Sequence, residues 1–172
     1  PPFVGKHLMK DTQGKELDRV WKGMKGNGLL DYVTGWYRLA AEFIQGTQIK
    51  AAFVSTNSIT QGEQPGILWG ELFGKFKLKI HFAYRTFKWV SEAKGKASVH
   101  VVIIGFGAHD TTSKLIFDEN NHVSTVSNIS PYLVEGADLA VVSRTLPITN
   151  VPRSIYGNKP TDGGTLIIEE ED

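Results

Sequence analysis

A run of basic and aromatic side chains between residues 75 and 96 is the part of this sequence whose residue types most clearly suggest chemistry. Seven Lys or Arg residues stand there against one acidic residue, Glu92, and five aromatic residues are interleaved with them. Basic side chains suit contacts with phosphate groups, and aromatic rings suit stacking on bases. The run therefore predicts a nucleic-acid partner. Its candidates for phosphate contacts are Lys88, Lys94 and Lys96.

The distribution of charge along the chain supports the same class of partner. Residues 1–100 hold 15 Lys and Arg against 8 Asp and Glu, a balance of +7, whereas residues 101–172 hold 4 against 10, a balance of −6. The net charge of +1 hides this division. A basic half fits a polyanionic partner.

Composition and spacing exclude several other chemistries. The chain has no Cys, which excludes a disulfide framework and a thiolate metal site. The five His residues form no ligand spacing such as HxxxH, and His81 and His100 fall in strand-like runs, so we expect no metal site. No apolar run reaches the roughly 20 residues of a membrane-spanning helix, so no membrane partner is predicted.

Hydrophobic periodicity predicts the elements that must position these residues. The order is helix, helix, strand, helix, strand, strand, which favours an α/β fold. The last two strands are joined by a polar loop too short for a crossover helix, so we expect them to pair antiparallel, with Phe76, Phe82 and Tyr84 packed in the core. The expected elements cover residues 15–25, 29–46, 50–56, 66–73, 77–87 and 97–106.

The segment 55–64, STNSITQGEQ, follows the first predicted strand, whose sequence is typical of a short buried strand. Ligands usually bind at this end of an open α/β sheet. Thr60 and Glu63 have the spacing of a capping box, which predicts that they begin the next helix. Alternatively, Asn57 and Gln61 line the substrate side.

The character of the chain changes after residue 107. We expect one domain over 1–107 and a loop-rich second part over 108–172. The second part contains YGNKPTDGG at 156–164, where glycines permit close backbone approach and Lys159 is a further candidate for a phosphate contact.

Several motifs occur in a fixed order that is informative as a set. PPF stands at 1–3, IKAAFVSTNSITQGEQPGILWGELF at 49–73, IHFAYRTFKWVSEAKGKASVHVVIIGF at 80–106 and SIYGNKPTDGG at 154–164. With these motifs the chain resembles the MmeI-like family of adenine-N6 DNA methyltransferases, found in fused restriction-modification enzymes and related phage-defence proteins. The resemblance covers nearly the whole chain.

The resemblance implies a fold and a position within it. The fold would be the C-terminal half of a Rossmann-like class I methyltransferase sheet, with an antiparallel last strand pair, followed by a loop-rich β segment. Residues 1–107 would end the catalytic domain, and 108–172 would lead into target recognition. The family motif Asn-Pro-Pro-Phe matches at its last three positions, so we expect its Asn just before Pro1 and the Gly-rich loop for S-adenosylmethionine further upstream. We expect this fragment alone to be inactive.

The resemblance also assigns roles to residues. The Pro1 carbonyl and the missing Asn would accept hydrogen bonds from the exocyclic amine of adenine, whose lone pair is otherwise delocalised into the ring. Phe3 would stack on the base after it is flipped from duplex DNA. A second aromatic, either Phe87 or Trp89, would cover its other face.

The implied protein is a cytoplasmic, S-adenosylmethionine-dependent enzyme that acts on double-stranded DNA together with the rest of its parent polypeptide. Two other functions remain open at this point. One is a nucleic-acid-binding module that performs no methyl transfer. The other is a fragment of an RNA methyltransferase.

Overall fold

The computed structural model describes residues 1–90, 98–144, 146 and 148–151. Its order of helices and strands over residues 1–107 is the one that the periodicity predicts, with short 3-10 helices between them. The elements are η1 (Lys6–Leu8), α1 (Asp11–Val20), η2 (Asn27–Leu29), α2 (Thr34–Phe43), β1 (Lys50–Thr56), η3 (Asn57–Thr60), α3 (Gln64–Gly74), β2 (Lys79–Val90), β3 (Ser98–Gly107), β4 (Lys114–Phe117) and β5 (Val123–Val126).

The strands form one five-stranded sheet in the order β1-β3-β2-β4-β5. β3 pairs antiparallel with both β1 and β2, and β4 pairs antiparallel with β5. β2 and β4 are the parallel pair. The α/β class and the antiparallel pairing of β2 with β3 are therefore confirmed.

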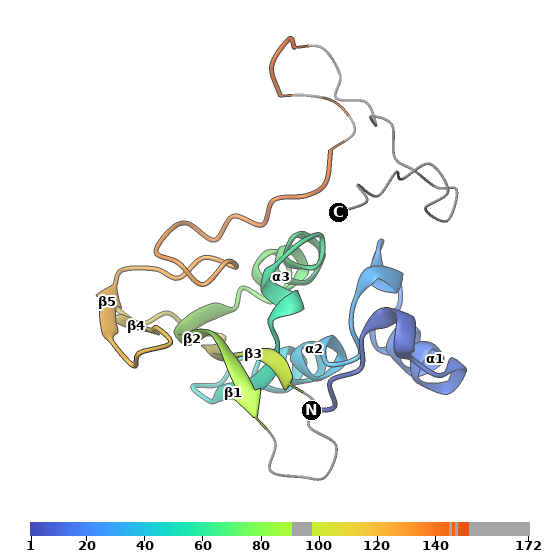
Figure 1. Cartoon of the computed structure of the whole chain (residues 1–172), viewed down its shortest axis with the longest axis horizontal. Helices are drawn as coiled ribbons and strands as arrows, with labels where there is room; N and C mark the ends of the chain where they lie inside the picture. The colour runs from blue at the N-terminus through green and yellow to red at the C-terminus, as the bar shows by residue number, and fades with distance from the viewer. Residues whose placement is uncertain (91–97, 145, 147, 152–172) are drawn as a thin grey trace, which may run out of the picture.

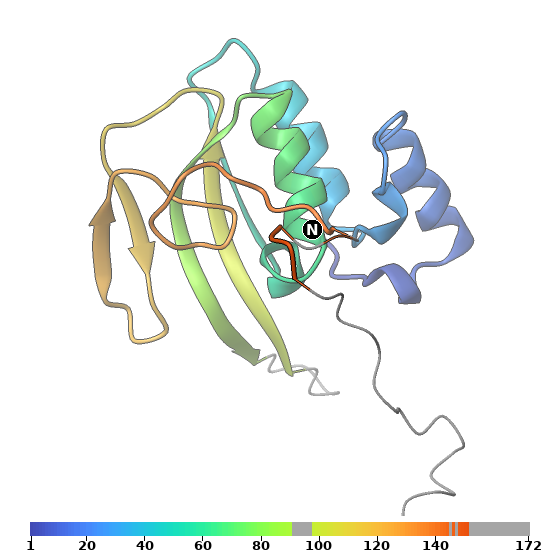
Figure 2. The same cartoon turned by 90° about the horizontal axis from the view of Figure 1, so that it is seen from above.

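Helices cover one face of this sheet. Figure 2 shows α2 and α3 side by side along it, with α1 outside them (Figures 1 and 2). Tyr37 of α2 is fully buried in this interface. Its ring stacks on Phe106 with centroids 5.4 Å apart and meets Phe53 edge-on at 5.2 Å, while its hydroxyl lies 2.8 Å from Ser55 Oγ. Burial raises the pKa of the Tyr37 hydroxyl, which stays protonated.

The prediction that β1 is a buried strand is wrong for this chain. β1 lies at one edge of the described sheet, and along it only Ser55 is fully buried. The run KAAFVST is apolar enough to suggest burial on both faces. Strand order is a property of the tertiary fold, and the local sequence does not contain it.

The boundaries of three helices also differ from the sequence prediction. The first helix runs from Asp11 to Val20 rather than over 15–25. The second helix begins at Thr34 rather than near residue 29, because Asn27–Leu29 form a 3-10 turn and Leu30 is extended. The capping box is not formed: the Thr60 hydroxyl donates to the carbonyl of Asn57, and α3 begins only at Gln64. Gly62 has φ +65°, a left-handed conformation that separates the two segments.

Beyond residue 107 the chain first extends the sheet and then becomes irregular. β4 and β5 follow, and the rings of Tyr84 and Phe117 stack at 4.1 Å, joining β4 to β2. After β5, among the described residues, the backbone forms an isolated antiparallel bridge between Ile129 and Glu135. The division of the chain into 1–107 and 108–172 stays a prediction. No helix in the described ranges combines the length and the apolar character needed to cross a bilayer.

Candidate functional site

A cavity of about 680 Å³ lies where β1 ends. One wall is the N-terminal segment, and the other is the connection from β1 to α3. The lining residues are Gly5–Leu8, Leu29, Asp31, Asn57, Ser58 and Gln61–Gln64. Asn57 and Gln61, which the sequence suggests as alternative substrate-side residues, are thus among the residues that face this cavity.

Asp31 holds the two walls of the cavity together. Its side chain is 6% exposed. The backbone N–H of Lys6 donates to Asp31 Oδ1 at 2.9 Å, and the Ser58 hydroxyl donates to Asp31 Oδ2 at 2.5 Å. The backbone N–H of Asp31 itself donates to Gln64 Oε1 at 3.0 Å. One carboxylate therefore connects the N-terminal segment to the connection that follows β1.

The PPF segment leads into this cavity wall. Pro1 is exposed and Phe3 is 37% exposed, so neither ring is part of the core. Val4 is fixed by its carbonyl, which accepts a hydrogen bond from the Tyr32 N–H at 2.9 Å. The sequence Gly5–Leu8 then turns into η1. The catalytic candidates Pro1 and Phe3 are thus presented at the surface by an anchored segment.

The C-terminal end of β2 lies at the same end of the sheet as the C-terminal end of β1. Thr56 of β1 and Phe87 of β2 both pair with Val101 of β3, from opposite sides. Phe87 and Trp89 share one face of β2, with ring centroids 6.4 Å apart. Phe87 is half-buried, whereas Trp89 is 44% exposed.

A second, smaller cavity connects the two regions. It measures about 110 Å³ and is lined by Thr60, Gln61, Arg85, Thr86, Tyr132 and Leu133. Gln61 lines both cavities. The segment after β1 is therefore next to Arg85 and Thr86, in the second half of β2.

The basic candidates separate into distinct groups. Lys88 is exposed near the end of β2. Lys94, Lys96 and Lys159 lie outside the described residues. Lys79, which belongs to the basic run in the sequence, forms an ion pair with Asp138 and so serves a structural contact.

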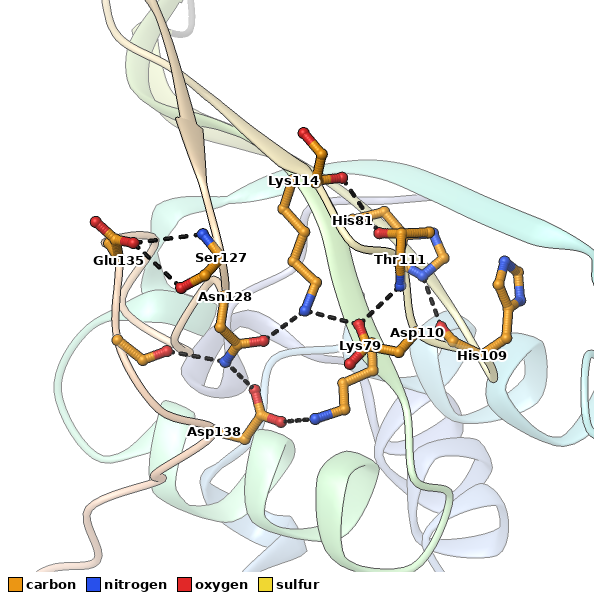
Figure 3. A network of polar contacts seen from close by, with 12 residues as sticks. Lys79, His81, His109, Asp110, Thr111, Lys114, Ser127, Asn128, Glu135 and Asp138 are labelled. Atoms are coloured by element: carbon orange, nitrogen blue, oxygen red, sulfur yellow. Dashed lines mark hydrogen bonds and ion pairs between the residues drawn. The ribbon is translucent and has the colours of Figure 1, made fainter.

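That ion pair is part of a polar network at the other end of β2 (Figure 3). Lys114 Nζ, 1% exposed, donates to Asp110 Oδ1 at 2.8 Å and to Asn128 Oδ1 at 2.6 Å. Asn128 Nδ2 donates to Asp138 Oδ1 at 2.7 Å. The hydrogen bond to Asp138 raises the pKa of Lys79, and the hydrogen bond from Lys114 lowers the pKa of Asp110. The network joins the sheet to the loops after β5.

Two histidines adjoin this network. His81 and His109 have ring centroids 4.8 Å apart, and His81 Nε2 lies 2.8 Å from the carbonyl oxygen of His109. His81 and His100 lie on β2 and β3, as the sequence pattern predicts. Across the part of the chain that the structure describes, His, Cys, Asp and Glu side chains form no group of three suited to a metal ion.

Asp31 is the residue that sequence reasoning missed. Its signal is a lone carboxylate in the apolar run LLDYV at 29–33. Charged residues are seldom buried unless they are paired, so a charge inside such a run indicates a specific contact. The expected helix over 29–46 placed it on an ordinary helical turn, and its partners at positions 6 and 58 are distant in sequence.

The comparisons with known proteins agree on one family. The profile described as "MmeI, DNA-methyltransferase domain" matches residues 1–118. A curated relative, "DNA methyltransferase A" of Bacillus subtilis (strain 168), is 46% identical over 169 residues, which is 97% of this chain and 19% of the relative. The family profile matches as far as residue 118, so its match extends past the predicted domain boundary at residue 107 and includes β4.

A solved structure gives the same result. It is described as the type IIL restriction-modification enzyme MmeI in complex with DNA, and it matches with a TM-score of 0.87 and 46% identity. The alignment covers 95% of this chain and 23% of that chain. The fold is thus that of a methyltransferase-type α/β domain. The chain belongs to the MmeI DNA-methyltransferase domain family, and it spans about a fifth of the relatives that it matches.

Proposed function

We propose that this chain forms the part of a DNA methyltransferase that holds the target base, and that the methylated atom is N6 of adenine. The observation that carries the proposal is the arrangement of two cavities. The residues that follow PPF line a cavity together with Asn57, and a second cavity joins the segment after β1 to Arg85 and Thr86, which directly precede the aromatic end of β2. Family membership supplies the reaction class.

Methyl transfer to this amine requires no strong general base. The exocyclic amine of adenine is a poor nucleophile because its lone pair is delocalised into the ring. The Pro1 carbonyl accepts a hydrogen bond from this amine and holds it in a reactive orientation, which is positioning together with preorganised electrostatics. Phe3 stacks on one face of the extruded base. The exposure of Trp89 supports it, rather than the half-buried Phe87, as the ring on the other face.

S-adenosylmethionine supplies the electrophilic methyl group when it is bound. The described residues fit only the base-facing side of such a site. Asp31 lines the cavity, and its two oxygens already accept hydrogen bonds from the Lys6 N–H and the Ser58 hydroxyl, so this carboxylate serves a contact within the protein. We therefore propose that the main donor-binding loop belongs to another part of the parent polypeptide.

The proposed partners follow from charge and family. Duplex DNA would be contacted by Lys88, with Lys94, Lys96 and Lys159 as further proposed contacts. The rest of the parent polypeptide would supply target recognition, in a restriction-modification context and in the cytoplasm, where cellular DNA is accessible. The similar MmeI structure is a complex with DNA, which supports this partner.

The experiment uses the full-length parent protein with labelled S-adenosylmethionine and duplex DNA. The DNA is digested to nucleosides, and the labelled product is identified by mass spectrometry. We expect N6-methyladenine. Label only in structured RNA would identify an RNA methyltransferase, and tight DNA binding without label would identify a binding module. Either result would overturn the proposal.

Replacement of the two aromatic rings tests the site. Phe3→Ala and Trp89→Ala should each lower turnover about 10- to 100-fold, the loss expected for one stacking face. Thermal stability should change little, because both rings are substantially exposed. Phe43→Ala is the matched control, since Phe43 is 76% exposed on α2 and outside the site. A Trp89 variant that melts much lower, yet keeps its turnover per folded molecule, would identify Trp89 as a packing residue.

A further inference from the structure

Asp31 is a buried carboxylate that the proposed reaction does not use. It lines the cavity, but both of its oxygens accept hydrogen bonds from within the protein. Its backbone carbonyl also accepts hydrogen bonds, from Thr34 Oγ1 at 2.7 Å and from the Thr34 N–H at 3.0 Å. These bonds fix the backbone of Asp31 just before the start of α2, so its side chain projects from a rigid part of the chain.

The contacts of Asp31 lie close to the PPF segment along the chain. Lys6, whose N–H binds Oδ1, is three residues after Phe3. Tyr32, next to Asp31, binds the carbonyl of Val4. The segment is therefore held at residues 4 and 6 from one place. Upstream of these two points, the fixed φ of Pro1 and Pro2 limits the directions that the chain can take.

The second oxygen of Asp31 sets the opposite wall of the cavity. Ser58, which donates to Oδ2, lies in η3 directly after Asn57. Hydrogen bonds to an ionised carboxylate are short and strong relative to neutral ones. One side chain therefore determines both where the PPF segment lies and how far it stands from the residues that follow β1.

We propose that Asp31 is a positioning residue for methyl transfer, which acts by holding the PPF segment and η3 at a fixed separation through Lys6 and Ser58. The inference rests on the proposed function, because it assigns the held segment to the target base. It predicts that loss of the carboxylate misplaces Pro1 and Phe3 while the DNA-binding surface at the end of β2 stays in place.

The test compares Asp31→Asn, Asp31→Ala and Ser58→Ala in the full-length parent. Misplacement of a reacting group by about 1 Å costs about 10²-fold in rate. We therefore expect Asp31→Ala to lower kcat about 10²-fold, with KM for duplex DNA within about threefold of wild type. Asp31→Asn keeps one acceptor and should fall between. The effects of Asp31→Ala and Ser58→Ala should be less than additive, because both remove the same contact.

Asp138→Asn is the matched control. Asp138 is also a carboxylate with two partners, Lys79 and Asn128, but it belongs to the network at the other end of β2. It should lower thermal stability without changing kcat per folded molecule. Equal losses of kcat in the Asp31 and Asp138 variants would show a general structural effect and overturn the proposal.

Hydrogen exchange separates failure of this inference from failure of the proposed function. Asp31→Asn should increase exchange at the amide of Lys6, which loses a charged acceptor, relative to amides in β3. If the parent transfers no methyl group to DNA, the proposed function fails, and so does the assigned role of Asp31. If the parent is active, and exchange and kcat both stay at wild-type values in Asp31→Asn and Asp31→Ala, the positioning role alone is wrong.

Discussion

The imidazole of His81 is 6% exposed on β2, and its two nitrogens have different surroundings. Nε2 lies 2.8 Å from the carbonyl oxygen of His109. A carbonyl only accepts, so Nε2 carries the hydrogen, and Nδ1 is buried without a partner among the described residues. Burial, reinforced by the positive charges of Lys50 and Lys114, lowers the pKa of His81. The ring is therefore stable in its neutral form.

A pH dependence of stability follows from this lowered pKa. Between the folded pKa and the ordinary value of 6.5, the unfolded chain binds more protons than the folded one, so the free energy of unfolding rises with pH. Melting temperatures measured from pH 8 to pH 5 should therefore fall as the pH drops below about 6.5.

His81→Gln tests the origin of that fall. Glutamine keeps an N–H donor at about the position of Nε2 but does not titrate. The variant should lose less stability than wild type between pH 8 and pH 5. His100→Gln, at an exposed position on β3, should leave the pH profile as it is in wild type. Equal profiles in wild type and His81→Gln would mean that another group controls the acid-side loss.

At the level of elements, α3 shows close packing of a loop against a helix. A Cβ added at Gly66 would lie 2.3 Å from the carbonyl oxygen of Val141, closer than atoms can approach. A Cβ at Gly70, one turn further along, would lie 4.0 Å from the Cβ of Ala140, an ordinary contact. Gly66 and Gly70 therefore differ in what they permit, although the sequence PGILWGELF does not distinguish them.

Alanine at these two positions should have opposite effects. Gly66→Ala must displace the segment around Val141 from α3, at a cost of about 1–3 kcal/mol. Gly70→Ala should stabilise the protein by about 0.5–1 kcal/mol, because alanine favours the helix and meets no clash. Chemical denaturation measures both values, and hydrogen exchange at 139–142 should rise only in Gly66→Ala. A neutral Gly66→Ala with unchanged exchange would show that the segment does not pack on α3 in solution.

Elements were predictable from sequence where their pattern is local. The strand-like run at 97–106 predicted β3, and the helical periodicity within 15–25 and 29–46 predicted α1 and α2. The predictions that failed concerned features that depend on contacts beyond the local sequence pattern. Thr60 has the spacing of an N-cap, but Gly62 takes a left-handed turn and Thr60 bonds to Asn57 instead.

The candidate site shows the same limit. The residue types of PPF and of the aromatic end of β2 were visible in the sequence. The alignment of the end of β1 with the end of β2, however, depends on the register of both strands with β3 at Val101. Asp31 was missed because the residues it joins lie 25 and 27 positions away. Long-range hydrogen bonds of this kind leave no periodic signal.

For the whole molecule, the division of charge corresponds to a division of structure. The basic half contains the PPF segment and β2, whereas the acidic half begins within β3. Part of the charge is neutralised by ion pairs within the protein, because Asp110 pairs with Lys114 and Asp138 pairs with Lys79. Lys88 is exposed near the end of β2, at the candidate site. Lys15 is exposed on α1, which lies outside the helices that cover the sheet (Figure 2).

Binding of the parent protein to duplex DNA should depend strongly on salt, and Lys88 should contribute one phosphate contact to that dependence. Each phosphate neutralised by a lysine releases a counterion, so Lys88→Gln should reduce the slope of log K against log salt concentration by about 1. The reduction should be the same for different DNA sequences, because a phosphate contact carries no sequence information. Lys15→Gln removes the same charge from α1 and should leave the slope unchanged. Affinities measured between about 50 and 200 mM salt decide the matter. Equal reductions in both variants would reflect net charge alone, and an unchanged slope in Lys88→Gln would place the DNA backbone away from the end of β2.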